Sequence, residues 1–121
     1  MKPTIFLIIV LLQIACNDEP KNTEAPDKKE VQMNTNEQQG LDLVAKSGCF
    51  TCHKVDQLFN GPAYTAIAAR YPKNEQVIDS LSQKIIKGGV GNWGTIPMQP
   101  NPAIKQDDAK LMVEYILSLK Q

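Results

Sequence analysis

Two cysteines and a histidine lie close enough together in this chain to act as one chemical unit, in the stretch Cys49-Phe50-Thr51-Cys52-His53. Two thiols separated by two residues and followed at once by an imidazole form the attachment motif of c-type haem. In that chemistry both thiols bond covalently to the vinyl groups of the porphyrin, and the adjacent imidazole binds the iron. The stretch therefore predicts that Cys49 and Cys52 hold a haem and that His53 is an iron ligand.

The same two cysteines could instead form a dithiol redox motif or half of a zinc site. A structural zinc site needs four ligands, yet the only other cysteine is Cys16 and the only histidine is His53. Thioredoxin-like chemistry requires a βαβ pattern around the motif, and the sequence that follows it is typical of short helices and loops. The context therefore favours haem attachment.

Length and composition limit the rest of the interpretation. A chain of 121 residues with 42% hydrophobic content allows one domain at most. The formal net charge is zero, which indicates neither a nucleic-acid-binding surface nor a surface for acidic substrates. The apolar stretches after residue 37 are short, so a buried prosthetic group would add substantially to so small a core.

The first sixteen residues, 1–16, have the layout of an export signal. Lys2 gives a positive start, residues 5–12 are all apolar, and the small Ala15 precedes Cys16. The apolar run is shorter than the roughly 20 residues that a membrane span needs. One interpretation is a plain cleavable signal. We favour a bacterial lipoprotein signal, in which Cys16 is lipidated, because Cys16 is left over once the other two cysteines hold haem.

Residues 17–36 form a polar linker, in which Ala25, Val31 and Met33 are the only apolar members. Such a composition cannot bury enough surface to offset the entropy lost on ordering. Fully extended, the linker would reach about 65 Å. We therefore expect an exported protein, anchored to a membrane through Cys16 on the periplasmic side, whose folded domain of residues 37–121 moves on a tether.

The folded domain has the patterning of four short helices, and we find no strands in it. The expected elements are a first helix capped by Thr35 or Asn36 and ended by Gly48, a second from Pro62 to Ala69, a third capped by Asn74 and closed at Gly88, and a last helix capped by Asp107. In the last helix the apolar residues at helical spacing, including Met112, are expected to face the core.

Residues 88–106 are rich in glycine, proline and asparagine, and they are predicted to form a long loop. A structureless loop of that length in a compact domain is evidence either against the assignment or for a functional role. Met98 stands in it between two prolines, which stiffen the backbone and could hold a thioether against a metal. Met33 belongs to the linker and Met112 to the core pattern. With no second histidine, the residues alone leave the sixth iron ligand as Met98, a lysine, an external molecule or nothing.

The folded domain resembles the small bacterial monohaem class I cytochromes c, in particular the cytochrome c-551/c-552 group. The resemblance covers about residues 40–120. It is carried by four stretches: Gly48-Cys49-Phe50-Thr51-Cys52-His53, Gly61-Pro62-Ala63-Tyr64, Trp93-Gly94-Thr95-Ile96-Pro97-Met98 and Tyr115-Ile116-Leu117-Ser118-Leu119-Lys120. All c-type haem proteins share the first stretch. The pattern Trp-Gly-x-x-Pro-Met, followed by proline and asparagine, is specific to this group.

The resemblance implies an all-α cytochrome c fold around one covalently attached haem c. Cys49 and Cys52 would then make the thioethers, and His53 and Met98 would be the axial ligands of the iron. Pro62 would offer its carbonyl to the other ring nitrogen of His53, which fixes the tautomer.

The resemblance also implies supporting roles for three further side chains. Trp93 would meet a haem propionate, as would Lys84, which stands where the group often has an arginine. Asn101 would contact the methionine sulfur. Gln99 departs from the proline that is common in the group, and the N-terminal tether is not part of the pattern of its soluble members.

The expected function is a one-electron carrier that makes no bonds and is therefore not an enzyme. Its partners would be a quinol-oxidising complex upstream and an oxidase or reductase downstream, and the protein would act as a monomer that binds no nucleic acid. The alternative is a haem-based catalyst or gas sensor with a labile sixth ligand, which the lack of a distal histidine and the presence of Met98 disfavour. A haem-free dithiol module would leave the Pro-Met loop without a purpose.

Overall fold

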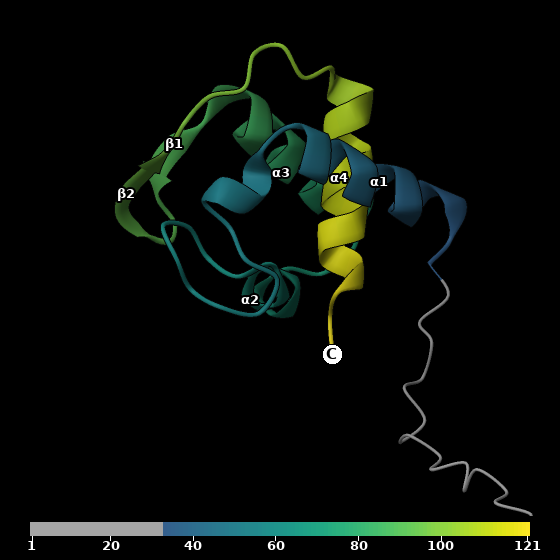
Figure 1. Ribbon diagram of the computed structural model, residues 1–121, viewed down its shortest axis with the longest axis horizontal. Coiled ribbons are helices and arrows are strands. Elements are labelled where there is room, and N and C mark those ends of the chain that lie inside the picture. The colour runs from purple at the N-terminus through teal and green to yellow at the C-terminus, as the bar shows by residue number, and fades with distance from the viewer. Residues whose placement is uncertain (1–32) are drawn as a thin grey trace, which may run out of the picture. The chain divides into compact units, whose positions relative to one another are not determined.

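The structure is a computed structural model that describes residues 33–121. The expected signal with Cys16, and the linker as far as residue 32, lie outside the described residues. The elements follow in the order α1 (Thr35–Lys46), the short 3-10 helix η1 (Cys49–Thr51), α2 (Tyr64–Arg70), α3 (Glu75–Lys87), β1 (Gly89–Gly91), β2 (Gly94–Met98) and α4 (Gln106–Ser118) (Figure 1). The mostly helical fold with four α-helices confirms the predicted fold class.

Helices α1 and α4 cross each other (Figure 1), and their contact is the most extensive between helices in the described chain. Gly40 of α1 lies where the two helices meet. A Cβ atom placed on Gly40 would overlap the backbone oxygen of Leu111 and would lie 2.8 Å from the Cβ of Tyr115. The absent side chain is therefore what allows the two helix backbones to approach so closely.

The core forms around α4, and all four α-helices contribute to it. Its buried members are Val44 from α1, Tyr64 from α2, Ile85 from α3, and Ala109, Met112, Val113, Tyr115, Ile116 and Leu117 from α4. Met112 is 1% exposed, in agreement with its predicted place in the core. Because the apolar faces of α1, α2 and α3 all meet α4, this last helix fixes the positions of the other three.

The expectation of a domain without strands was wrong. Residues 89–98 fold as an antiparallel hairpin in which Gly89 pairs with Met98 and Gly91 with Gly94. Glycine and proline are depleted from strands, so their abundance here hid the hairpin from sequence reasoning. Both strands are largely exposed, and a two-stranded hairpin of this kind needs support from neighbouring elements.

Two helix starts also differ from the expected ones. Asn34, rather than Thr35 or Asn36, caps α1 through a reciprocal capping box with Glu37. Lys105 precedes α4 without a side-chain cap, while Asp107 lies inside the first turn, where its carboxylate interacts favourably with the helix dipole.

Met33, which the sequence placed in the linker, packs against the core. Asn74 caps α3 as predicted, by accepting a hydrogen bond from the Val77 amide at 2.9 Å.

Among the helices of residues 33–121, none has the length and apolar content needed to cross a membrane.

The contact at Gly40 yields a prediction. Gly40→Ala should lower the free energy of unfolding by at least about 1 kcal/mol, because the overlap with α4 outweighs the gain in helix propensity. The control Gln39→Ala, at the exposed neighbouring position, should change it by less than about 0.5 kcal/mol. Urea unfolding of both variants measures the difference. A Gly40→Ala variant as stable as the parent would mean that the two helices separate easily.

Candidate functional site

The cysteine motif begins where α1 ends. Gly48 adopts a left-handed conformation, with φ of 71°, which turns the chain out of α1 and into η1. Within the motif the amide of His53 donates to the carbonyl of Cys49 at 3.0 Å. Cys49 is half-buried, Cys52 is exposed, and no disulfide joins them. The 3-10 turn and the two residues after it therefore present two thiols and an imidazole from one short stretch of chain.

His53 has one ring nitrogen already committed to the protein. Its Nδ1 lies 2.8 Å from the carbonyl oxygen of Pro62, which is the contact that the resemblance implies. A carbonyl can only accept, so Nδ1 carries the proton and Nε2 has a free lone pair. Gly61 permits this arrangement, because a Cβ there would lie 2.5 Å from Cε1 of the imidazole. The histidine is thus held in the tautomer that binds a metal through Nε2.

The chain between Cys52 and Gly61 forms a closed loop. The amide of Gly61 donates to the carbonyl of Cys52 at 2.8 Å, and the amide of Tyr64 donates to the carbonyl of Lys54 at 3.0 Å. The loop itself carries exposed apolar side chains, among them Leu58 at 81% exposure and Phe59 at 54%. Its ends are therefore fixed beside His53, while its middle faces outward.

Met98 is the last residue of β2, where its side chain is half-buried and packs against the core. Gly88 lets the end of β2 lie against the end of α3, because a Cβ at Gly88 would overlap the carbonyl oxygen of Met98. Directly after the strand, the Asn101 amide donates to the carbonyl of Ile86 at 3.0 Å, and its side-chain nitrogen donates to the carbonyl of Ile85 at 3.2 Å. These carbonyls belong to the last turn of α3, where no following helical amide is available to donate to them.

One cavity of about 370 Å³ joins the two halves of the site. All eight site residues predicted within the described chain line it: Cys49, Cys52, His53, Pro62, Lys84, Trp93, Met98 and Asn101. Core residues of α4, including Met112 and Val113, form another part of its lining, which is mostly apolar. The volume lies within the usual range for cofactor sites. Paired thiols and an imidazole, with a thioether in the same apolar cavity, are a donor set that fits a haem.

The three supporting side chains differ in how they are placed. Asn101 donates to the carbonyls of Ile85 and Gln99, so within residues 33–121 its hydrogen bonds go to backbone rather than to the Met98 sulfur. Lys84 extends past β1, with its Nζ 2.8 Å from where a Cβ of Gly89 would be, and makes no ion pair with another described residue. Trp93 is 41% exposed in the turn of the hairpin.

Residues 33–121 hold no cluster of three histidine, cysteine or acidic side chains that could bind a metal ion. Within residues 33–121, Cys49 and Cys52 are therefore not part of such a cluster.

A family model described as Cytochrome c matches residues 37–120. The chain belongs to the cytochrome c family. It is 46% identical over 79 residues to cytochrome c-551 of Allochromatium vinosum, covering 65% of this chain and 84% of that protein. It is 41% identical over 83 residues to cytochrome c-552 of Nitrosomonas europaea, covering 69% of this chain and 81% of that protein.

The solved structures agree with these relatives. The crystal structure of wild-type Nitrosomonas europaea cytochrome c552 matches with a TM-score of 0.62 and 41% identity, covering 66% of this chain and 99% of that one. This cytochrome c is thus a monohaem class I member of the cytochrome c-551/c-552 group. It carries one covalently bound haem c with its iron, and Cys49 and Cys52 stand at the cysteine positions of the attachment motif.

Sequence reasoning missed the role of Tyr64 in this cytochrome. Its ring stacks on the imidazole of His53, with centroids 5.4 Å apart and planes 15° apart, and meets Phe50 edge-on at 5.7 Å. The residue is only 2% exposed, and its hydroxyl has no hydrogen-bond partner among the described residues. Burial raises the pKa of the phenol above its usual value of 10.0. Tyr64 stood in one of the recognised stretches, but no local pattern indicates that its ring supports the histidine.

Tyr64→Phe should therefore stabilise the protein by about 1 kcal/mol at pH 7, because the ring contacts remain and a buried hydroxyl without a partner is removed. The parent should also lose stability above about pH 10, by up to about 1.4 kcal/mol per pH unit, and the variant should lose less. The sign follows from the raised pKa, since the unfolded chain releases the phenol proton at a pH where the folded chain still holds it.

Urea unfolding at pH 7 and pH 11 measures both effects. The control Tyr71→Phe removes a hydroxyl outside the cavity and should change either value by less than about 0.5 kcal/mol. A Tyr64→Phe variant that is less stable than the parent at pH 7 would show that the hydroxyl has a favourable partner.

Proposed function

We propose that this haem c electron carrier holds its iron between Nε2 of His53 and the sulfur of Met98, with Cys49 and Cys52 bonded to the porphyrin. The observation that carries the proposal is that a single apolar cavity is lined by both His53 and Met98, with the Nδ1 of His53 already bonded to Pro62. The haem supplies an iron that gains or loses one electron. Methionine ligation stabilises ferrous iron and so raises the midpoint potential relative to bis-histidine haem.

The neighbouring side chains have supporting roles in this proposal. Pro62 fixes the orientation of His53 and increases its donor strength. The Lys84 ammonium and the Trp93 indole N–H are the donors for the haem propionates, since both residues line the cavity and Lys84 has no other ionic partner among residues 33–121. Asn101 acts through the backbone, because its hydrogen bonds hold the segment after Met98 on the end of α3.

With His53 and Met98 both as ligands, the iron would have no position left for a substrate, and the protein would act as a carrier and not as an enzyme. A haem catalyst or gas sensor would need a vacant or labile sixth position with a polar group beside it. In the described chain, the cavity contains no histidine other than His53.

The cellular setting belongs to the same proposal. Residues 1–16 direct export, Cys16 is lipidated, and residues 17–32 tether the domain on the periplasmic side of a membrane. The domain works as a monomer and exchanges electrons with a quinol-oxidising complex upstream and an oxidase or reductase downstream. Support comes from the order of charged, apolar and small residues before Cys16, and from a composition in the linker that does not favour folding.

Replacing the proposed sixth ligand tests the axial pair. Met98→Ala should abolish the weak near-infrared band of sulfur-ligated ferric haem, lower the midpoint potential, and allow cyanide or carbon monoxide to bind. The matched control is Met33→Ala, because Met33 packs against the core but does not line the cavity, and this variant should keep the parent spectrum and potential. Spectroelectrochemical titration measures all three properties. An unchanged spectrum and potential in Met98→Ala would assign the sixth position to another group, with Lys84 the next to replace.

Replacing Cys16 tests the anchor. Lipidated protein should fractionate with membranes, whereas Cys16→Ser should accumulate as unprocessed precursor or as released protein. Cell fractionation and intact-mass measurement of the mature N-terminus provide the comparison. A mature parent protein with an unmodified N-terminus at another residue would contradict lipidation and would leave the electron-carrier function intact.

A further inference from the structure

The hairpin β1–β2 makes little contact with the helices, apart from the segments at its base. Among the described elements, the two strands pack extensively only on each other. At the base, Gly88 and Asn101 tie the hairpin to the end of α3, as described above. At the opposite end, the turn that joins the strands contains Asn92 and Trp93. Contacts at the base do not fix this turn, so its position depends on a separate contact.

Arg70, the last residue of α2, contacts this turn in two ways. Its Nη1 donates to the carbonyl of Asn92 at 2.8 Å, and its guanidinium carbon lies 4.6 Å from the centre of the Trp93 ring. The same guanidinium lies 5.6 Å from the Tyr71 ring, which meets Trp93 at a centroid distance of 6.4 Å. A planar guanidinium can stack on an aromatic ring and donate a hydrogen bond at its edge at the same time, which an ammonium does less well.

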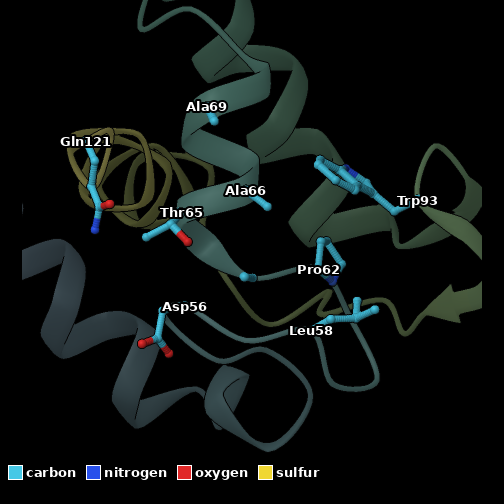
Figure 2. A pocket seen from close by; sticks show the side chains of 9 residues that line it. Asp56, Leu58, Pro62, Thr65, Ala66, Ala69, Trp93 and Gln121 are labelled. Carbon is cyan, nitrogen blue, oxygen red and sulfur yellow. The ribbon is translucent and has the colours of Figure 1, made fainter.

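Trp93 lies between two hollows. It lines the haem cavity, and it also lines a shallow hollow of about 630 Å³ on the outer side of α2. Figure 2 shows the indole extending from the hairpin toward Ala66 of α2, with Pro62 beside it. Pro62 also lines both spaces, so Trp93 and Pro62 together separate the haem cavity from the outer hollow.

We propose that Arg70 is a positioning residue that fixes Trp93 in the wall of the haem cavity by bonding the hairpin turn to α2. It also places a positive charge next to that wall, which favours ferrous over ferric iron. The hydrogen bond from Arg70 to Asn92 joins residues 22 positions apart in the chain. It therefore fixes the position of the hairpin turn relative to α2 and does not stabilise a local turn. The role of Trp93 toward the haem rests on the function proposed above, whereas its fixation by Arg70 does not.

The test uses the fact that Trp93 is the only tryptophan of the chain, so the protein has a single indole N–H signal in a proton–nitrogen spectrum. In the reduced, haem-loaded protein, Arg70→Gln should increase the hydrogen exchange rate of that indole about tenfold, through loss of a cation–π contact and a charged hydrogen bond. It should also lower the midpoint potential. Arg70→Lys keeps the charge, so it should keep the midpoint potential of the parent. Its indole exchange rate should lie between those of the parent and of Arg70→Gln.

Two controls separate positioning from general effects. Lys87→Gln removes one positive charge from an exposed residue that does not line the cavity, and it should shift the potential less than Arg70→Gln does. Backbone amides of α1 and α4 should exchange at the parent rate in all variants. The proposal is overturned if indole exchange in Arg70→Gln stays within about twofold of the parent, if helix amides accelerate to the same extent, or if Lys87→Gln lowers the potential equally. Failure of the Met98 assignment would appear in Met98→Ala alone and would leave the indole measurement unaffected.

Discussion

The close approach of α1 and α4 at Gly40 is the contact on which the rest of the site depends. The cysteine motif follows α1 after only two residues, so the direction of α1 decides where Cys49 and Cys52 point. Helix α4 provides Met112, Val113 and Ile116 to the lining of the cavity. The crossing therefore sets the distance between the attachment motif and the apolar surface on which a haem rests. A larger residue at position 40 would change both together.

The two sides of the cavity are held by different kinds of interaction. On the His53 side, hydrogen bonds close the loop around the imidazole, and the Tyr64 ring lies against it. On the Met98 side, an exposed hairpin is attached to α3 at its base and to Arg70 at its turn. Close packing limits movement more strongly than a few attachment points do. We therefore expect the histidine side to be the more rigid of the two, and the methionine side to open first.

Sequence reasoning placed the helices and the lining of the cavity better than it placed the connections. Helical spacing and the Asn74 cap identified α3, and local spacing singled out Cys49, Cys52, His53 and Met98. The other four cavity residues, Pro62, Lys84, Trp93 and Asn101, were expected only from the resemblance to cytochromes c-551/c-552. The hairpin was missed because its backbone pairing runs through glycines that otherwise indicate loops. The stacking of Tyr64 on His53 and the contact of Arg70 with Trp93 were missed for another reason. Both contacts join residues from different segments of the chain, and a single sequence holds no periodic signal for such pairs.

The loop closed by the bond between Gly61 and Cys52 has a consequence for how this domain can change in length. Because its ends are joined, residues added in its middle need not move His53. The entropy of closing a loop rises slowly, by only about 0.6 kcal/mol for each doubling of length. Insertions there would cost little stability, while they would extend the outward-facing surface around Leu58 and Phe59. This loop is therefore the part of the domain in which new contacts could evolve, or be engineered, without rebuilding the metal site.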